Sequence, residues 1–250
     1  MQIKQGQMNT KAYYVFSPWL RVFHWIMVIC IVVLFVTGLY IADPFFIGTQ
    51  GMEPTFASDK IVSMSYIRYI HFIAGYVLTV SLILKIYGFI TNPGDRLFPK
   101  PWDVKYWTGM IDTKLHYLFL RPKHKPYVRN SLARSGYAAV YVMILIQIIT
   151  GFAMYFAIDP NRPLAKIFSF LAVLGDEYML HIIHHLVTWA IMLFVIIHIY
   201  MAIRADFMER DGEISSMFSG MKYMTEEPDD IEDVIGSKRR KGIQNTGELK

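Results

Sequence analysis

Apolar residues in this chain gather into four long runs, about residues 19–42, 69–90, 136–158 and 179–203. Each run has roughly 20 residues, the length that a helix needs to cross the hydrocarbon layer of a membrane. The only full charges inside them are Arg21, near the start of the first run, and Lys85, near one end of the second. The pattern therefore predicts an all-α membrane protein, a bundle of four transmembrane helices.

Two shorter apolar stretches do not fit a membrane span. Residues 164–174 are too few to cross and predict an interfacial or re-entrant piece. Residues 102–120 mix aromatic and aliphatic residues with charged ones, which predicts an amphipathic helix at the membrane surface. No internal repeat stands out. We expect residues 1–225 to form one membrane domain and 226–250 to be a charged, mobile tail.

Lysine and arginine are distributed unequally between the two sides of the predicted bundle. The side with both termini and the long second loop holds most of them, whereas the opposite loops hold Lys60, Arg68, Arg162 and Lys166. Positively charged loops stay in the cytoplasm, so both termini are predicted to be cytoplasmic. This topology accounts for the net charge of +5, and no nucleic-acid partner is expected.

The composition narrows the chemistry that the chain can perform. Residues are 54% apolar and 18% charged, and the mean hydropathy is +0.33, which is typical of a membrane protein. The single cysteine, Cys30, lies in an apolar run and excludes a disulfide framework. It also excludes an iron–sulfur cluster or structural zinc held by cysteines of this chain alone. Without a Cys-x-x-Cys-His motif, any haem here is held without thioether bonds.

Four histidines lie inside the predicted spans, where polar groups are costly and usually functional. From the direction of each span, His24 and His198 lie near the cytoplasmic face, and His71 and His184 near the outer face. The histidines thus form two pairs, one at each depth.

The fourth span offers one histidine at each depth. His184 and His198 are 14 residues apart, which places them within about 40° of the same helix face and about 21 Å apart along the axis. His185 and His181 lie about 140° and about 100° away from His198 around the helix. They are poorer candidates, although His185 stays open as an alternative to His184.

Two imidazoles from facing helices at one depth are the usual ligands of a b-type haem. Zinc would need more ligands at one depth, and a proton relay would normally include Asp or Glu in the spans. The sequence therefore predicts two haem b groups, whose irons are bound by His24 with His198 and by His71 with His184. Small residues beside these levels would make room for a flat macrocycle or simply pack helices together: Gly38, Gly75, Gly136 and Gly151.

Several motifs resemble the b-type cytochrome subunits of membrane-bound nickel–iron hydrogenases, over about residues 13–223. They are Arg21-Val-Phe-His24-Trp25 with Thr37-Gly38, Tyr66-Ile-Arg68-Tyr-Ile-His71, the His184 to His198 helix with Tyr200 to Arg204, and Ile214 to Gly220. The resemblance implies electron transfer from a periplasmic hydrogenase, through two haems, to a membrane quinone of a respiratory chain. The implied partners are the iron–sulfur small subunit and the nickel–iron large subunit, in a bacterial or archaeal cytoplasmic (inner) membrane.

Alternatives remain at this stage. The paired histidines also occur in formate dehydrogenase-type complexes, and a stand-alone di-haem oxidoreductase fits them too. A transporter or channel is disfavoured because the spans lack acids and broken helices. No hydrogen-activating site, cluster or flavin motif is present, so electrons must be handed to this chain.

A quinone site is expected beside the cytoplasmic haem, because electrons that enter outside leave inside. The candidates are His124, Arg129 and Asn130, just before the third span. His124 would titrate near neutral pH and relay a proton, and Asn130 would donate to a quinone carbonyl. A simpler interpretation is that Arg129 is a positive-inside anchor and that Asn130 caps the helix.

Overall fold

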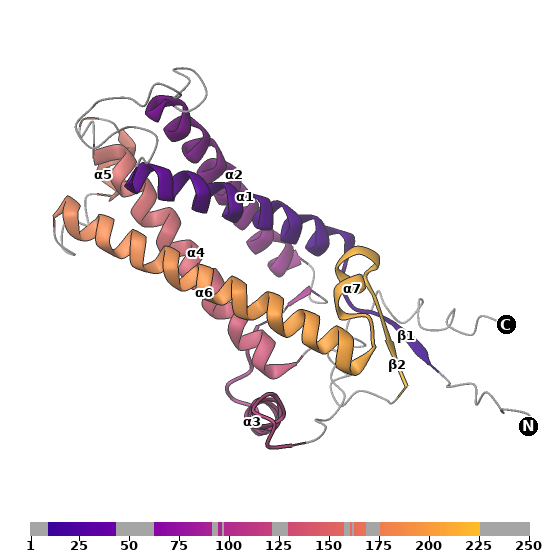
Figure 1. Ribbon diagram of the computed structural model, residues 1–250. Coiled ribbons are helices and arrows are strands. Elements are labelled where there is room, and N and C mark those ends of the chain that lie inside the picture. The colour runs from indigo at the N-terminus through magenta and orange to yellow at the C-terminus, as the bar shows by residue number, and fades with distance from the viewer. Residues whose placement is uncertain are drawn as a thin grey trace, which may run out of the picture. The chain divides into compact units, whose positions relative to one another are not determined.

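The computed structural model describes residues 10–43, 63–91, 95–96, 98–121, 130–157, 161, 163–168 and 176–225. Within these ranges the chain forms helices and two short strands (Figure 1). In chain order they are β1 (Lys11–Tyr14), α1 (Pro18–Ala42), α2 (Met64–Thr91), α3 (Val104–Tyr117), α4 (Ser131–Ala157), α5 (Pro163–Phe168), α6 (Glu177–Glu209), α7 (Glu213–Ser219) and β2 (Met221–Met224).

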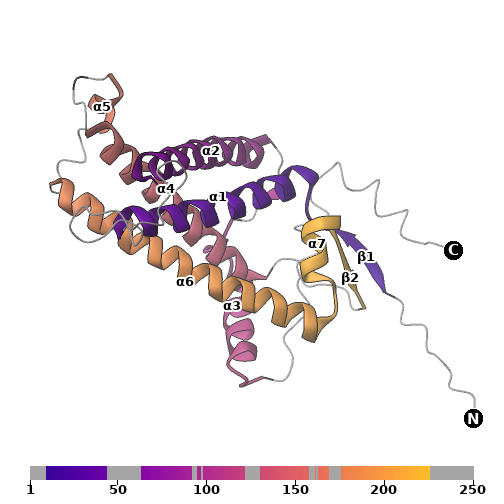
Figure 2. The same cartoon turned by 45° about the horizontal axis from the view of Figure 1, so that its top comes forward.

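The chain divides into two compact units. The first unit comprises Met1–Arg21, Phe89–Ile144 and Ala190–Lys250, and the second comprises Val22–Gly88 and Leu145–Trp189. The division between the units falls within helix α4, after Ile144, and within helix α6, after Trp189. Figure 2 shows α4 and α6 among the long helices of the chain. The prediction of one membrane domain over residues 1–225 stays a prediction, and 226–250 lie outside the described residues.

Helices α1, α2, α4 and α6 are each long and apolar enough to cross a membrane, which confirms the four predicted spans. The helices are longer than the apolar runs at several ends. Thus α2 begins at Met64, α4 begins at Ser131 and α6 ends at Glu209. Hydropathy measures only the apolar part of a helix, and polar residues in the headgroup layer continue the same hydrogen-bonded backbone.

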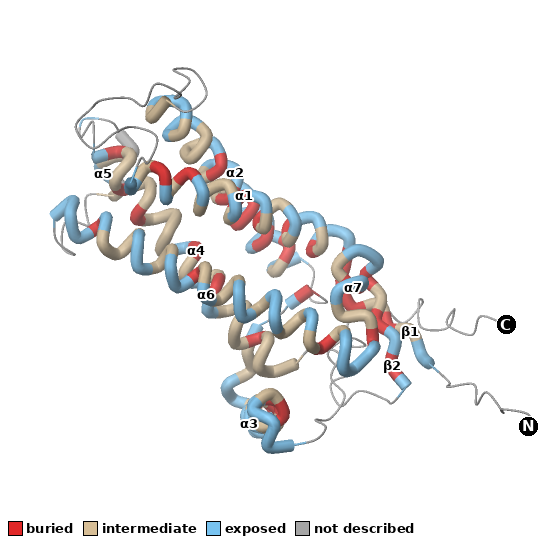
Figure 3. Tube along the Cα trace, in the orientation of Figure 1, coloured by how far each residue is buried: buried red, intermediate tan, exposed pale blue. Residues whose placement is uncertain are grey.

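The surface of the long helices suits lipid rather than water. Large apolar side chains stay exposed, such as Ile29 (62%) and Val36 (60%) on α1 and Leu193 (60%) on α6. Figure 3 shows exposed residues recurring along both helices. A membrane removes the cost of exposing such side chains, because lipid tails are as apolar as the side chains themselves. The chain is a multi-pass membrane protein.

The two shorter apolar stretches form short helices, and their predicted places at the membrane surface stay predictions. Helix α3 is capped by Asp103, whose side chain accepts a hydrogen bond from the Lys105 backbone N–H at 2.9 Å. It buries Tyr106 and Thr113 and exposes Ile111, and is therefore amphipathic. Helix α5 has six residues, too few to span.

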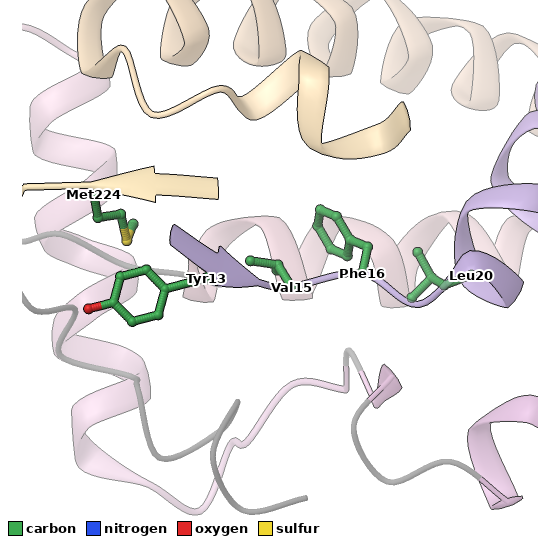
Figure 4. Packing of buried hydrophobic residues seen from close by; sticks show 5 residues of the cluster. All are labelled: Tyr13, Val15, Phe16, Leu20 and Met224. Atoms are coloured by element: carbon green, nitrogen blue, oxygen red, sulfur yellow. The ribbon is translucent and has the colours of Figure 1, made fainter. Parts of the chain in front are cut away.

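The β1–β2 sheet was not predicted from the sequence. The strands pair antiparallel, with Lys11 opposite Met224 and Tyr14 opposite Met221. Four-residue strands are too short to show a clear period of two, so the hydrophobic pattern did not reveal them. A small apolar cluster packs here: Tyr13, Val15, Phe16, Leu20 and Met224 (Figure 4).

Gly220 directly follows α7 and contacts the segment before α1. Its φ is +83°, and a Cβ there would lie 2.6 Å from the Phe16 carbonyl oxygen, so only glycine fits. The Gly220 carbonyl accepts the Val15 N–H at 2.8 Å. The segments that flank the first and last long helices are therefore held together.

A buried cluster of charges supports the same region. Lys222 forms ion pairs with Glu213 and with Asp211, the latter at 3.7 Å. Burial opposes the charge on Lys222, but these carboxylates outweigh it and raise the lysine pKa above its usual value. Burial raises the pKa of the Asp211 carboxyl to about 6. Removing Lys222 would leave the buried Asp211 carboxylate without its cation, which is usually strongly destabilising.

Candidate functional site

The His71 side chain sits against a Thr-Gly pair on a neighbouring helix. The Thr37 hydroxyl of α1 lies 2.8 Å from Nδ1 of His71 on α2. A Cβ built on Gly38 would lie 3.4 Å from Cε1 of the same imidazole. We call Thr37, Gly38 and His71 the first seat. The sequence left open whether Gly38 makes room for a macrocycle or packs helices together; in the structure the edge of the His71 ring lies there.

An equivalent arrangement holds His184. The Thr150 hydroxyl of α4 lies 2.8 Å from Nδ1 of His184 on α6. A Cβ on Gly151 would lie 3.3 Å from Cε1 of that ring. We call Thr150, Gly151 and His184 the second seat. Both seats belong to the second unit.

The two seats have the same spacing along the chain. Thr37 and His71 are 34 residues apart, and so are Thr150 and His184. No internal repeat was predicted from the sequence, and neither was the contact of Thr37 or Thr150 with a histidine. The available signal was local: a Thr-Gly pair precedes each of these two histidines by the same interval. Hydropathy cannot reveal it, because two residues in a long apolar run barely change the mean.

Helix α6 is tied to α4 beside the second seat. The Gln147 side-chain nitrogen donates to the His184 carbonyl at 2.8 Å and to the Thr188 hydroxyl at 2.6 Å. Hydrogen bonds between membrane helices contribute about 0.6 kcal/mol each on average. These two fix the α6 turn that carries His184 relative to α4.

The neighbouring histidines of α6 have different surroundings. His181 is exposed, and its Nδ1 lies 2.9 Å from the Glu177 carbonyl of its own helix. His185 is exposed as well, whereas His184 is half-buried. The geometry favours His184 over His185 as the outer ligand on this helix.

The other predicted pair is divided between the units. His24 on α1 lies in the second unit, next to Trp25 at 5.3 Å between ring centroids. His198 on α6 lies in the first unit, stacked on Phe194 at 5.7 Å and 4°. The pairing of His24 with His198 stays a prediction.

The remaining glycines have separate roles. A Cβ on Gly136 would lie 3.3 Å from Phe194, the residue that stacks on His198. Gly75, one turn beyond His71, has no atom within 4 Å of its Cβ position. Open space one turn from a candidate ligand fits the room that a macrocycle would need.

The predicted quinone residues are only partly described. His124 and Arg129 lie outside the described residues. The Asn130 side-chain oxygen accepts the Leu132 N–H at 2.8 Å at the start of α4, so the capping role is confirmed. The cap uses the oxygen, while a quinone carbonyl would need the amide nitrogen as donor.

The profile of the prokaryotic cytochrome b561 family matches residues 15–220, which include all four span histidines and both seats. The chain belongs to the prokaryotic cytochrome b561 family. This cytochrome therefore binds haem b and serves electron transport. The resemblance seen in the sequence is confirmed.

Relatives named as hydrogenase subunits match most of this cytochrome. The "Probable Ni/Fe-hydrogenase 1 B-type cytochrome subunit" of Escherichia coli (strain K12) is 36% identical over 230 residues, 88% of this chain and 94% of that protein. The corresponding subunit of Rhodobacter capsulatus is 35% identical over 83% of this chain and 80% of its own length. That of Cupriavidus necator is 35% identical, with 86% and 88% covered.

The two seats fit a haem of this cytochrome. Iron of a b-type haem takes imidazole nitrogens as axial ligands, and a ligating histidine usually has its other ring nitrogen hydrogen-bonded. In both seats Nδ1 is the bonded nitrogen, so Nε2 is the atom that would bind iron. His71 and His184 are therefore the residues that would hold one haem.

Replacing Gly151 by Ala tests the close contact in the second seat. The new Cβ would press on the His184 ring at 3.3 Å, tighter than ordinary contact, and should tilt the ligand and reduce haem occupancy. The measurement is haem per chain by absorption in the purified cytochrome. Val36→Ala, on the exposed face of α1, is the control and should bind haem normally. Full occupancy with an unchanged spectrum in Gly151→Ala would contradict this account.

Proposed function

We propose that this chain is the di-haem cytochrome b subunit that carries electrons from a periplasmic hydrogenase across the membrane to quinone. One observation carries the proposal: two matched seats present His71 and His184 in a chain whose relatives are named hydrogenase B-type cytochrome subunits. His71 and His184 bind the outer haem, and His24 and His198 bind the inner one. Bound haem b supplies a one-electron redox couple at each level.

The placement of the ligands supports transfer across the membrane. His184 and His198 both lie on α6, which is one continuous helix from Glu177 to Glu209. At 1.5 Å per residue, their spacing puts the two ligands about 21 Å apart along the helix. Helix α6 therefore carries one ligand for each side of the hydrocarbon layer.

The partners follow from what the chain lacks and from the names of its relatives. The single cysteine, Cys30, cannot hold an iron–sulfur cluster alone. The hydrogenase small subunit delivers electrons from the nickel–iron large subunit to the outer haem. A formate dehydrogenase-type complex or a stand-alone oxidoreductase would use the same histidines, but the relatives' names favour hydrogenase.

Two observations support cytoplasmic termini in a bacterial or archaeal inner membrane. The β1–β2 sheet pairs the segment before α1 with the segment after α7, which supports both ends being on one side. The excess of lysine and arginine on that side supports the cytoplasm. Asp211, Glu213 and Lys222 would then lie on the side where quinone takes up protons.

The His184→Ala variant tests the pairing of ligands. It should lose the outer haem and keep the inner one, because only His71 and His184 serve the outer iron. The measurement is haem per chain together with the visible spectrum of the purified complex. His185→Ala is the matched control and should keep both haems. Two six-coordinate haems in His184→Ala would show that the pairing is wrong.

A second pair of variants tests the quinone site. His124→Leu removes a proton relay, and Asn130→Asp keeps the capping oxygen while it removes the amide donor. Both variants should retain two haems that the donor reduces. Loss of a hydrogen bond to quinone costs about 1.4 kcal/mol, so quinone reduction in Asn130→Asp should slow roughly tenfold. Normal quinone reduction in both variants would place the site elsewhere.

A further inference from the structure

We propose that Thr37 and Thr150 are positioning residues that hold His71 and His184 in one tautomer, with the proton on Nδ1 and the lone pair on Nε2. The inference rests on the proposed function, which places a haem between these histidines. The hydroxyl groups of these two threonines would fix the orientation of a neutral imidazole inside the membrane.

The Thr37 hydroxyl already uses its proton in a hydrogen bond within its own helix. Its Oγ1 lies 2.7 Å from the Val33 carbonyl oxygen. Two oxygens this close repel unless a proton lies between them, and a carbonyl has none to give. The hydroxyl therefore donates to Val33, and it can only accept from the imidazole at 2.8 Å. Nδ1 of His71 must carry the proton.

The second seat has the same pattern of hydrogen bonds. Thr150 Oγ1 lies 2.8 Å from the Ile146 carbonyl oxygen and 2.8 Å from Nδ1 of His184. Its single proton is used by the carbonyl, so the oxygen accepts from the Nδ1–H of His184. Both seats thus select the same tautomer by the same two bonds.

The glycine beside each threonine completes the orientation. The threonine oxygen contacts Nδ1, and Gly38 or Gly151 lies under Cε1 of the same ring. These contacts set both the position and the rotation of the imidazole plane. A flipped ring would place a carbon opposite the hydroxyl and lose the bond. In hydrocarbon no water would replace it.

The hydrogen bond also changes the strength of the ligand. An imidazole that donates its Nδ1–H is more basic at Nε2, and a more basic ligand favours oxidised iron. Thr37 and Thr150 therefore lower the midpoint potential of the outer haem. A lower midpoint potential at the outer haem favours electron transfer from the outer haem to the inner haem.

The experiment compares valine and serine at each position in the whole purified complex. Thr37→Val and Thr150→Val keep the shape of the side chain but remove the hydroxyl. Each should raise the midpoint potential of the outer haem in a redox titration and change its low-spin magnetic resonance spectrum. The double variant should show a larger rise than either single variant. Thr37→Ser and Thr150→Ser keep the hydroxyl and should stay near the native potential.

Thr79→Val is the matched control. Thr79 makes the same bond from its hydroxyl to a carbonyl of its own helix, Gly75 at 2.7 Å, and should leave both haems unchanged when replaced. Unchanged potential and spectrum in both valine variants would overturn the proposal. Equal haem loss in the valine and serine variants would also overturn it, since the hydroxyl would then not matter. Haem loss with valine and retention with serine would support it.

Failure of this inference is distinguishable from failure of the proposed function. If His184→Ala loses the outer haem while the valine variants keep native potentials, only the role of the threonines is wrong. If His184→Ala keeps two six-coordinate haems, the ligand assignment itself is wrong.

Discussion

The central constraint on this chain is that an imidazole inside hydrocarbon must have a partner for its N–H. Water is absent there, and an unpaired donor costs several kcal/mol. In both seats a threonine hydroxyl on the facing helix is the hydrogen-bond partner of Nδ1, at 2.8 Å each. The glycine beside it lets the helices approach closely enough for that bond. The helix pairs α1–α2 and α4–α6 are thus matched at the positions of their ligands.

The matched seats relate the threonine–histidine hydrogen bonds to electron transfer across the membrane. Each helix pair delivers one imidazole in the same tautomer, so the iron between them would meet two equivalent ligands. Helix α6 also carries His198, 14 residues further along the chain. The four span histidines lie on long helices rather than loops, which would limit the movement of any redox group that they hold.

The spans and the family were predictable from the sequence, because hydropathy reports lipid burial and histidines in a span form a rare pattern. The role of the four span histidines as haem ligands stays a prediction. The hydrogen-bond partners of the histidines were not predictable. Threonine is common in membrane helices, and nothing in a single sequence shows which carbonyl or imidazole Thr37 and Thr150 face. The β1–β2 sheet was missed because its strands are four residues long. The end of α6 was missed because polar residues continue the helix to Glu209.

The account is tested most directly by purifying the membrane complex through this chain, counting haem and nickel, and adding hydrogen under anaerobic conditions. The account predicts two haem b per copy of the chain, a nickel-containing partner, and reduction of both haems by hydrogen. One haem per chain, or two haems that stay oxidised under hydrogen although the nickel subunit is present and active, would contradict it.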